Sequence, residues 1–146
     1  MRNVIGIGIL AVVLIGGFIF RDFLSGNAAE LKVGDCFDEP ASLSETVEDV
    51  QHHPCSDTHD AEVFLVEDFS TADAAAYPAD AEMEAWVTEK CFPAYLGYTG
   101  RDYVTDPDFG IAWFQPDEES WKESQRVTCY LYRLDETPFK GSQKAA

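Results

Sequence analysis

The residues of this chain that are best suited to chemistry lie within nine consecutive positions. Three histidines, one cysteine and two aspartates occur there: His52, His53, Cys55, Asp57, His59 and Asp60. Zinc takes imidazole, thiolate and carboxylate ligands in tetrahedral geometry, so these residue types could form a metal site. Two features argue against it: Cys55 is better used in a disulfide, and the adjacent His52 and His53 point to opposite faces of an extended segment. The sequence therefore predicts no metal and no other cofactor.

His59 is the best placed of these histidines for a specific role. We expect it to be a partly exposed turn residue before a strand that begins at Ala61, hydrogen-bonded by Asp60 or Glu62. Alternation along that strand places Asp60 and Glu62 on one face and Ala61 and Val63 on the other. A position that binds a ligand or a partner is the alternative, which makes His59, Asp60 and Glu62 candidate binding residues.

Aromatic side chains between Cys91 and Cys129 form a second group of candidates. Most of them are expected in the core. Exposed ones from Tyr98 to Tyr103 could form a binding surface, because tyrosine is favoured at protein interfaces. Tyr98 and Tyr103 are therefore candidate binding residues as well.

Catalytic motifs are not found in the sequence. It contains no G-x-S-x-G, S-x-x-K or H-E-x-x-H pattern. With 27 acidic residues, some carboxylate pair will lie at a glycosidase-like separation by chance, so their abundance is uninformative. The sequence favours a non-catalytic protein. An envelope hydrolase or a metal-binding protein that uses His59 with nearby carboxylates is the alternative.

A calcium loop is suggested by Asp106-x-Asp108-x-Gly110. An EF-hand needs glycine at its sixth position and glutamate at its twelfth, where this chain has Ile111 and Asp117. We therefore expect a solvated turn here.

Charge and hydropathy divide the chain sharply. Its 146 residues include 27 Asp and Glu against 10 Lys and Arg, a net charge of −17. A chain this acidic repels phosphate backbones, so nucleic acid is not an expected partner. All the acidic residues follow residue 21, and residues 22–146 carry a net charge of −19.

Residues 4–20 are uncharged and mostly aliphatic. As a helix they would be about 25 Å long, at the short end of what spans a ~30 Å hydrocarbon core. We expect residues 1–21 to form an uncleaved signal anchor with a single transmembrane helix; a cleaved signal peptide, followed by secretion, is the alternative. Arg2 and the α-amino group favour a cytoplasmic N-terminus, which places the following domain outside the cell membrane.

The elements that must position the candidate residues follow from hydrophobic periodicity. Apolar–polar alternation predicts strands over residues 31–37, 46–51, 61–67, 109–114 and 126–134. Helical spacing from Asp80 predicts one main helix that ends or kinks near Phe92, because Pro93 cannot donate a backbone hydrogen bond. The predicted fold class is α+β, a small antiparallel sheet with one main helix packed on it.

This fold is expected to occupy residues 31–136. Residues 22–30 are predicted to be a juxtamembrane linker, and residues 137–146 a polar, flexible tail that frays from the domain. The segment from Pro116 to Glu119 suits the first turn of a short helix.

Four cysteines, Cys36, Cys55, Cys91 and Cys129, form an even set without a C-x-x-C pair. Outside the cytosol such cysteines normally pair, so we expect two structural disulfides. Three connectivities are possible from the residues alone.

Several short motifs, taken in order, resemble the septum formation family. They are Leu31-x-Val33-Gly34-Asp35-Cys36-Phe37, Pro54-Cys55-Ser56-x-x-His59-x-x-Glu62-Val63, Cys91 with Tyr98-x-Gly100, and then Pro116, Trp121, Arg126 and Cys129. Two positions depart from the family pattern: Thr58 stands where proline is usual, and Ser124 where glycine is usual.

This family comprises membrane-anchored extracytoplasmic domains of Gram-positive bacteria. The resemblance implies that the four cysteines pair in sequence order. It also implies a role near the cell envelope or the division septum, and it implies no known reaction. We expect the domain to act there by binding an envelope or division protein.

Overall fold

A computed structural model describes residues 28–40, 49–69 and 76–146 of the chain. The expected signal anchor over residues 1–21 lies outside these residues, as do most of the predicted linker and part of the predicted strand over 46–51. Within the described part, no helix has the length and apolar character needed to cross a membrane.

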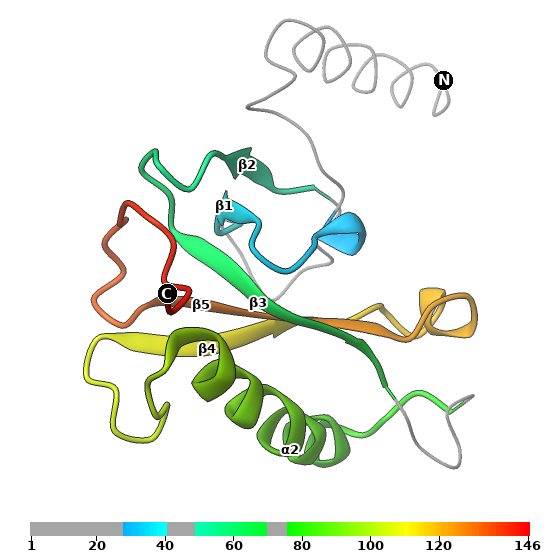
Figure 1. The fold of residues 1–146 in the computed structure, drawn as a ribbon. Helices are drawn as coiled ribbons and strands as arrows, with labels where there is room; N and C mark the ends of the chain where they lie inside the picture. Colours follow the sequence, from blue (N-terminus) through cyan, green and yellow to red (C-terminus); the bar gives the residue numbers. More distant parts are fainter. Residues whose placement is uncertain (1–27, 41–48, 70–75) are drawn as a thin grey trace, which may run out of the picture.

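Five strands of the described residues form one antiparallel sheet. They are β1 (Cys36–Asp38), β2 (Gln51–His53), β3 (Ala61–Asp68), β4 (Phe109–Phe114) and β5 (Arg126–Arg133). Their order is β2-β1-β3-β5-β4, and every neighbouring pair is antiparallel. The main helix, α2 (Asp80–Thr99), lies along one face of the central strands (Figure 1). The predicted fold class, an antiparallel sheet with one main helix, is confirmed for this part of the chain.

Each face of the sheet carries its own apolar cluster. On the helix side, Trp86 and Tyr95 of α2 pack with Leu131 of β5. On the other side, Phe37 and Tyr130 belong to a second cluster, which the short helix η1 (Ala28–Glu30) helps to cover. Because neighbouring residues of a strand point to opposite faces, β5 contributes to both clusters.

The helix begins as the sequence predicts. Asp80 and Glu82 lie in its first turn, where carboxylates stabilise the positive end of the helix dipole. The Glu82 carboxylate also accepts the backbone N–H of Ala79 at 2.9 Å. A second short helix, η2 (Ser120–Lys122), follows the predicted first turn at residues 116–119.

The predicted end of the helix near Phe92 is wrong, because α2 continues through Pro93 to Thr99. A proline inside a helix costs roughly 3 kcal/mol. Beyond it, Tyr95 and Tyr98 are buried against the sheet, and this packing offsets the cost. The helix instead ends at a glycine, Gly100, whose φ of 73° is left-handed.

All four cysteines are described, and they form two disulfides. Cys36 pairs with Cys55, and Cys91 pairs with Cys129. The first joins β1 to the turn before β3, and the second joins α2 to β5. The pairing in sequence order that the resemblance implies is confirmed.

The C-terminal segment does not fray, contrary to the prediction for residues 137–146. The backbone N–H of Gly141 donates to the carbonyl of Cys55 at 2.6 Å, and that of Ala145 to the carbonyl of Tyr98 at 2.8 Å. Phe139 is buried in the helix-side cluster. The segment therefore returns across the start of β3 and belongs to the domain (Figure 1).

Candidate functional site

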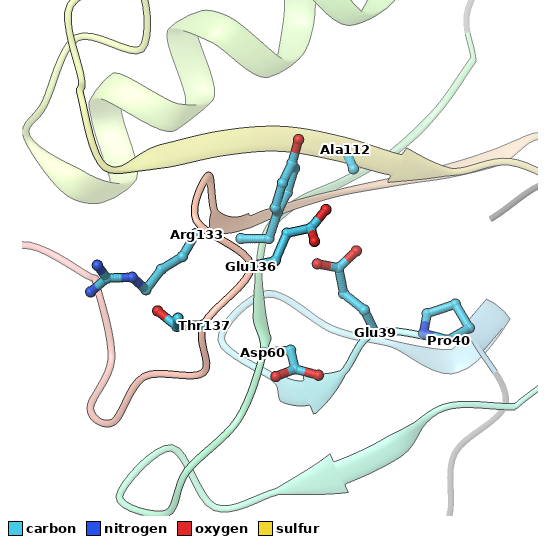
Figure 2. Close-up of a pocket in the computed structure, with 8 residues that line it drawn as sticks. Glu39, Pro40, Asp60, Ala112, Arg133, Glu136 and Thr137 are labelled. Atoms are coloured by element: carbon cyan, nitrogen blue, oxygen red, sulfur yellow. The ribbon is translucent and has the colours of Figure 1, made fainter. Parts of the chain in front are cut away.

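A hollow of about 500 Å³ opens beside the ends of the central strands. We call it the acidic pocket, and its lining residues are Glu39, Pro40, Asp60, Ala112, Tyr132, Arg133, Glu136 and Thr137. The three acidic residues come from three separate places: after β1, before β3, and in the turn after β5. Figure 2 shows the carboxylates of Glu39 and Glu136 turned toward one another, with Asp60 below them. The fold thus brings three negatively charged side chains together around one hollow.

The charges in the acidic pocket are poorly compensated. Burial raises the pKa of Glu39, and the negative charges of Asp60 and Glu136 raise it further, while a contact from the Tyr130 hydroxyl opposes them. Burial also raises the pKa of Asp60, and the neighbouring Asp38 adds to that shift. A cation in the pocket would relieve this repulsion.

Arg133 is the only basic residue among those described as lining the pocket, and it is engaged elsewhere. Its guanidinium donates to both carboxylate oxygens of Asp135, at 3.0 and 2.8 Å. Figure 2 shows this side chain directed away from Glu39 and Glu136. The pocket therefore keeps its negative charge.

Two backbone features shape the wall of the pocket. Gly110 of β4 lies directly opposite Tyr132 of β5, and a Cβ on Gly110 would come within 2.8 Å of the tyrosine ring. The missing side chain gives the Tyr132 ring its room. Glu136 has a left-handed φ of 58°, a conformation that costs a non-glycine residue roughly 1–2 kcal/mol. Its carboxylate is held at the pocket despite that cost.

A second group of polar residues lies inside the domain, around His59. The ring of His59 is completely buried and packs edge-on against Phe139, with ring centroids 4.4 Å apart. Its Nδ1 lies 2.8 Å from the carbonyl oxygen of Asp57, so Nδ1 carries a proton and donates it to that oxygen. Its Nε2 is buried and has no hydrogen-bond partner among the described residues.

Glu62 is also completely buried, and its carboxylate accepts three hydrogen bonds. The hydroxyl of Tyr98 donates at 2.6 Å, and the backbone N–H of Gln143 donates at 2.7 Å. The hydroxyl of Ser142 is the third donor. Burial raises the pKa of Tyr98 to about 12, with a further contribution from Glu62, so the phenol stays protonated at neutral pH. The carboxylate thereby ties α2 and the C-terminal segment to β3.

Three of these buried residues could act together as metal ligands. Cys36 and Glu62 are cross-strand partners, and His59 lies three residues before Glu62. Each offers one ligand atom, and these atoms all lie within 4.8 Å of one another. We call this group the Cys36–His59–Glu62 cluster.

The structure corrects the expected surroundings of the candidate binding residues. His59 was expected to be partly exposed, but the C-terminal segment covers it. Tyr98, expected at an exposed aromatic surface, is 8% exposed and donates to Glu62. Tyr103 is half-buried and packs against the rings of Phe92 and Tyr95.

The candidate residues fall into three places. Asp60 lines the acidic pocket, whereas His59, Glu62 and Tyr98 lie inside the domain, and Tyr103 packs beside α2. The alternation predicted at β3 holds for Ala61 and Val63, which join the cluster on the face opposite the helix.

The histidines, cysteine and aspartates between His52 and Asp60 that the sequence suggested as metal ligands do not come together in one site. Among the described residues, His59 is the one member of that set in a group with metal-ligand geometry. His53 instead contacts Asp38, with 2.8 Å from Nε2 to Oδ2. Closeness in sequence did not identify the neighbours of His59, because Cys36 of β1 and Glu62 of β3 are the residues that lie beside it.

The suggested calcium loop is a turn, but its first aspartate is not solvated. The side chain of Asp106 is 2% exposed. It accepts the Tyr95 hydroxyl at 2.6 Å and lies 3.3 Å from Nε of Arg101. These contacts occupy the carboxylate.

Sequence reasoning missed Glu39, Tyr132 and Glu136 as pocket residues. Among 27 acids, nothing distinguishes the three that converge. Proximity in space is their shared property, and no motif marks it.

The fold and the site define a small α+β domain with two disulfides and an acidic surface pocket. The chain belongs to the septum formation family, because a family model described as "Septum formation" matches residues 26–140. This membership confirms the resemblance and indicates a role in septum formation. No curated protein and no solved structure matches the chain.

Proposed function

We propose that this protein acts in septum formation as a non-catalytic binding domain at the outer face of the cell membrane. The acidic pocket takes up a basic segment of an envelope or division protein. Residues 4–20 hold the domain at the membrane.

The convergence of Glu39, Asp60 and Glu136 on one hollow is the observation that carries this proposal. Carboxylates from three segments face a common space, and the nearby Arg133 is paired with Asp135 instead. A lysine or arginine side chain entering the pocket would neutralise charges that now repel one another. Tyr132 supplies a partly buried aromatic wall for the aliphatic part of such a side chain.

The charge of the whole domain supports a basic partner. Residues 22–146 carry a net charge of −19. A field of one sign accelerates encounter with an oppositely charged partner and keeps anionic polymers away.

The alternative function, an envelope hydrolase that uses His59, has less support. A hydrolase needs its histidine within reach of substrate and of a carboxylate in an open site. His59 and Glu62 are both 0% exposed, so neither side chain lies in an open site that a substrate could enter.

The test is a binding measurement on the full chain in neutral detergent micelles. The probe is a capped heptapeptide of alternating lysine and alanine, titrated by isothermal calorimetry; a glutamate–alanine peptide is the negative probe. We expect the lysine peptide to bind and the binding to weaken as salt rises.

A pair of variants localises the binding. Glu39→Gln with Glu136→Gln should weaken it about tenfold, since each of the two partly exposed ion pairs contributes up to about 1 kcal/mol. The matched control, Glu84→Gln with Glu89→Gln, removes the same charge from the exposed face of α2 and should change affinity little. Absence of binding, or equal losses in the two double variants, would overturn the proposal.

A further inference from the structure

The Cys36–His59–Glu62 cluster contains a feature that partner binding does not explain. Nε2 of His59 is buried and unpartnered among the described residues, whereas buried polar groups in proteins are normally hydrogen-bonded. Because Nδ1 donates to the Asp57 carbonyl, the neutral ring presents the lone pair of Nε2. Metal-binding histidines characteristically donate their other nitrogen to a backbone carbonyl or a carboxylate in this way.

The neighbours of His59 are the groups a metal would need. Cys36, His59 and Glu62 offer one ligand atom each within 4.8 Å. Around tetrahedral zinc, ligand atoms lie about 3.5 Å apart, so each would move by roughly 1 Å or less. Cys55 is bonded to Cys36 and lies at the same place, so it supplies a fourth ligand when that bond is open.

The carboxylate of Glu62 is held as a ligating carboxylate usually is. Tyr98 and Ser142 donate to its Oε1, and the Gln143 N–H donates to Oε2. Oε2 therefore keeps a lone pair for a further contact. Such outer hydrogen bonds orient metal ligands.

We propose that the Cys36–Cys55 disulfide and a zinc-type metal ion are alternative occupants of this cluster. When the disulfide is reduced, Cys36, Cys55, His59 and Glu62 form a closed four-ligand site. A site of this kind is structural, because four protein ligands leave no open coordination position. It joins β1, the turn at Cys55 and the start of β3 when the covalent bond is absent.

A dithiol reductant makes this conversion by thiol–disulfide exchange. Cys55 is partly exposed whereas Cys36 is buried, so the reductant thiolate attacks the sulfur of Cys55 and Cys36 leaves as a thiolate. The second thiol of the reductant then attacks the mixed disulfide and releases Cys55. The reductant is oxidised to its own disulfide, and the cystine is reduced to two thiols. Metal binding to both sulfurs as thiolates displaces their protons to solvent.

Cobalt(II) is the probe for this site, because its visible spectrum reports tetrahedral geometry and thiolate ligation. The full chain in detergent is stripped of metal, reduced with a phosphine without oxygen, and titrated with Co²⁺. We expect one equivalent of Co²⁺ with intense tetrahedral bands and thiolate charge-transfer absorption, displaced by Zn²⁺. The oxidised chain should show neither signal.

Variants identify the ligands. His59→Ala and Glu62→Gln should each weaken Co²⁺ binding about tenfold or more. The matched control His52→Ala removes the histidine next to His53 in β2 and should leave the spectrum unchanged.

A further control removes the second disulfide. Cys91→Ser with Cys129→Ser should retain the signal, because those sulfurs are not part of the cluster. The proposal is overturned if the reduced wild-type chain gives no tetrahedral thiolate spectrum. It is also overturned if that spectrum survives in both His59→Ala and Glu62→Gln. Near-ultraviolet circular dichroism of each metal-loaded variant separates ligand loss from loss of the fold.

Discussion

Glu62 shows how a single charged residue can organise this domain. Its carboxylate is removed from water, which would be costly if it were left unpaired. Donors from α2 and from the C-terminal segment replace the lost hydration. The side chain therefore joins three parts of the chain that are distant in sequence.

Replacing Glu62 by glutamine should destabilise the domain. The new amide would present N–H donors to groups that are themselves donors, and the bonds to a charged acceptor would be lost. We expect the free energy of unfolding in urea to fall by about 3 kcal/mol, and amide hydrogen exchange at Gln143 to accelerate. Glu67→Gln, at a half-exposed position of the same strand where the carboxylate lies 3.5 Å from Nζ of Lys90, should cost less than about 1 kcal/mol. Comparable losses in the two variants would contradict the role assigned to Glu62.

Glu136 lowers the stability of the domain but contributes to the acidic pocket. Its backbone has an unfavourable left-handed φ, while its side chain faces the pocket. Asparagine tolerates the left-handed conformation better than glutamate does. Glu136→Asn should therefore raise the free energy of unfolding by up to about 1 kcal/mol. It should also weaken binding of the lysine peptide about fivefold, because one carboxylate is lost. Denaturation and calorimetry on one preparation check both, and a parallel fall in stability and affinity would contradict this interpretation.

At the scale of elements, α2 depends on tertiary contacts more than on its own sequence. It contains Pro93 and Gly97, which both disfavour helix. Its second half persists because Tyr95 and Tyr98 are buried and because the Cys91–Cys129 disulfide holds it to β5. The exposed positions of this half therefore offer room for stabilisation.

Two glycine substitutions, one within α2 and one directly after it, should change the free energy of unfolding in opposite directions. A Cβ at Gly97 would meet nothing within 4 Å, so Gly97→Ala should gain about 1 kcal/mol of stability from helix propensity. Gly100 has a left-handed φ of 73°, and Gly100→Ala should lose about 1 kcal/mol. Thermal unfolding of both variants measures the difference. A gain at Gly100 would mean that its conformation is not required.

At the scale of the whole molecule, the concentration of acidic residues affects how stability depends on pH. The pKa of Glu39 is raised by burial and by the charges of Asp60 and Glu136, with the hydroxyl of Tyr130 opposing. An acid whose folded pKa is raised contributes most to stability below its ordinary pKa, here 4.5, and that contribution is lost as pH rises through the folded value.

Glu39→Gln mimics the protonated side chain and tests this dependence. At pH 7 the variant should be more stable than wild type in urea denaturation. The difference should shrink as pH falls through the raised pKa and should disappear below 4.5. A difference that stays constant from pH 7 to pH 4 would show that Glu39 titrates normally.

Membrane attachment is tested at the same scale. Arginine within an apolar membrane segment costs roughly 3 kcal/mol per residue, so Val12→Arg with Leu14→Arg should release the chain from the membrane fraction. In protoplasts of cells expressing wild type, external protease should digest the domain. Val33→Arg, at an exposed position of the domain, is the matched control for the double arginine variant and should stay in the membrane fraction. Recovery of a shortened wild-type chain in the medium would instead support a cleaved signal peptide.

The sequence by itself predicted β3, β4 and β5, the start of the helix, and the formation of two disulfides by the four cysteines, whereas β1 and β2 overlap only the ends of the strands predicted over residues 31–37 and 46–51. These properties depend on local periodicity, capping residues and composition, which neighbouring residues specify. The family motifs added the order of pairing. Even so, the local rule for Pro93 misplaced the end of α2, because burial further along the helix outweighed it.

Only the tertiary structure decided which side chains meet. It buried His59 and Tyr98, bound the polar C-terminal segment to β3, and brought Glu39, Asp60 and Glu136 to one pocket. Each of these outcomes depends on contacts between residues that are far apart in the chain. Whether a polar side chain is solvated or buried depends on what packs over it. The covering segments are distant in sequence, and no local sequence pattern specifies where they will lie.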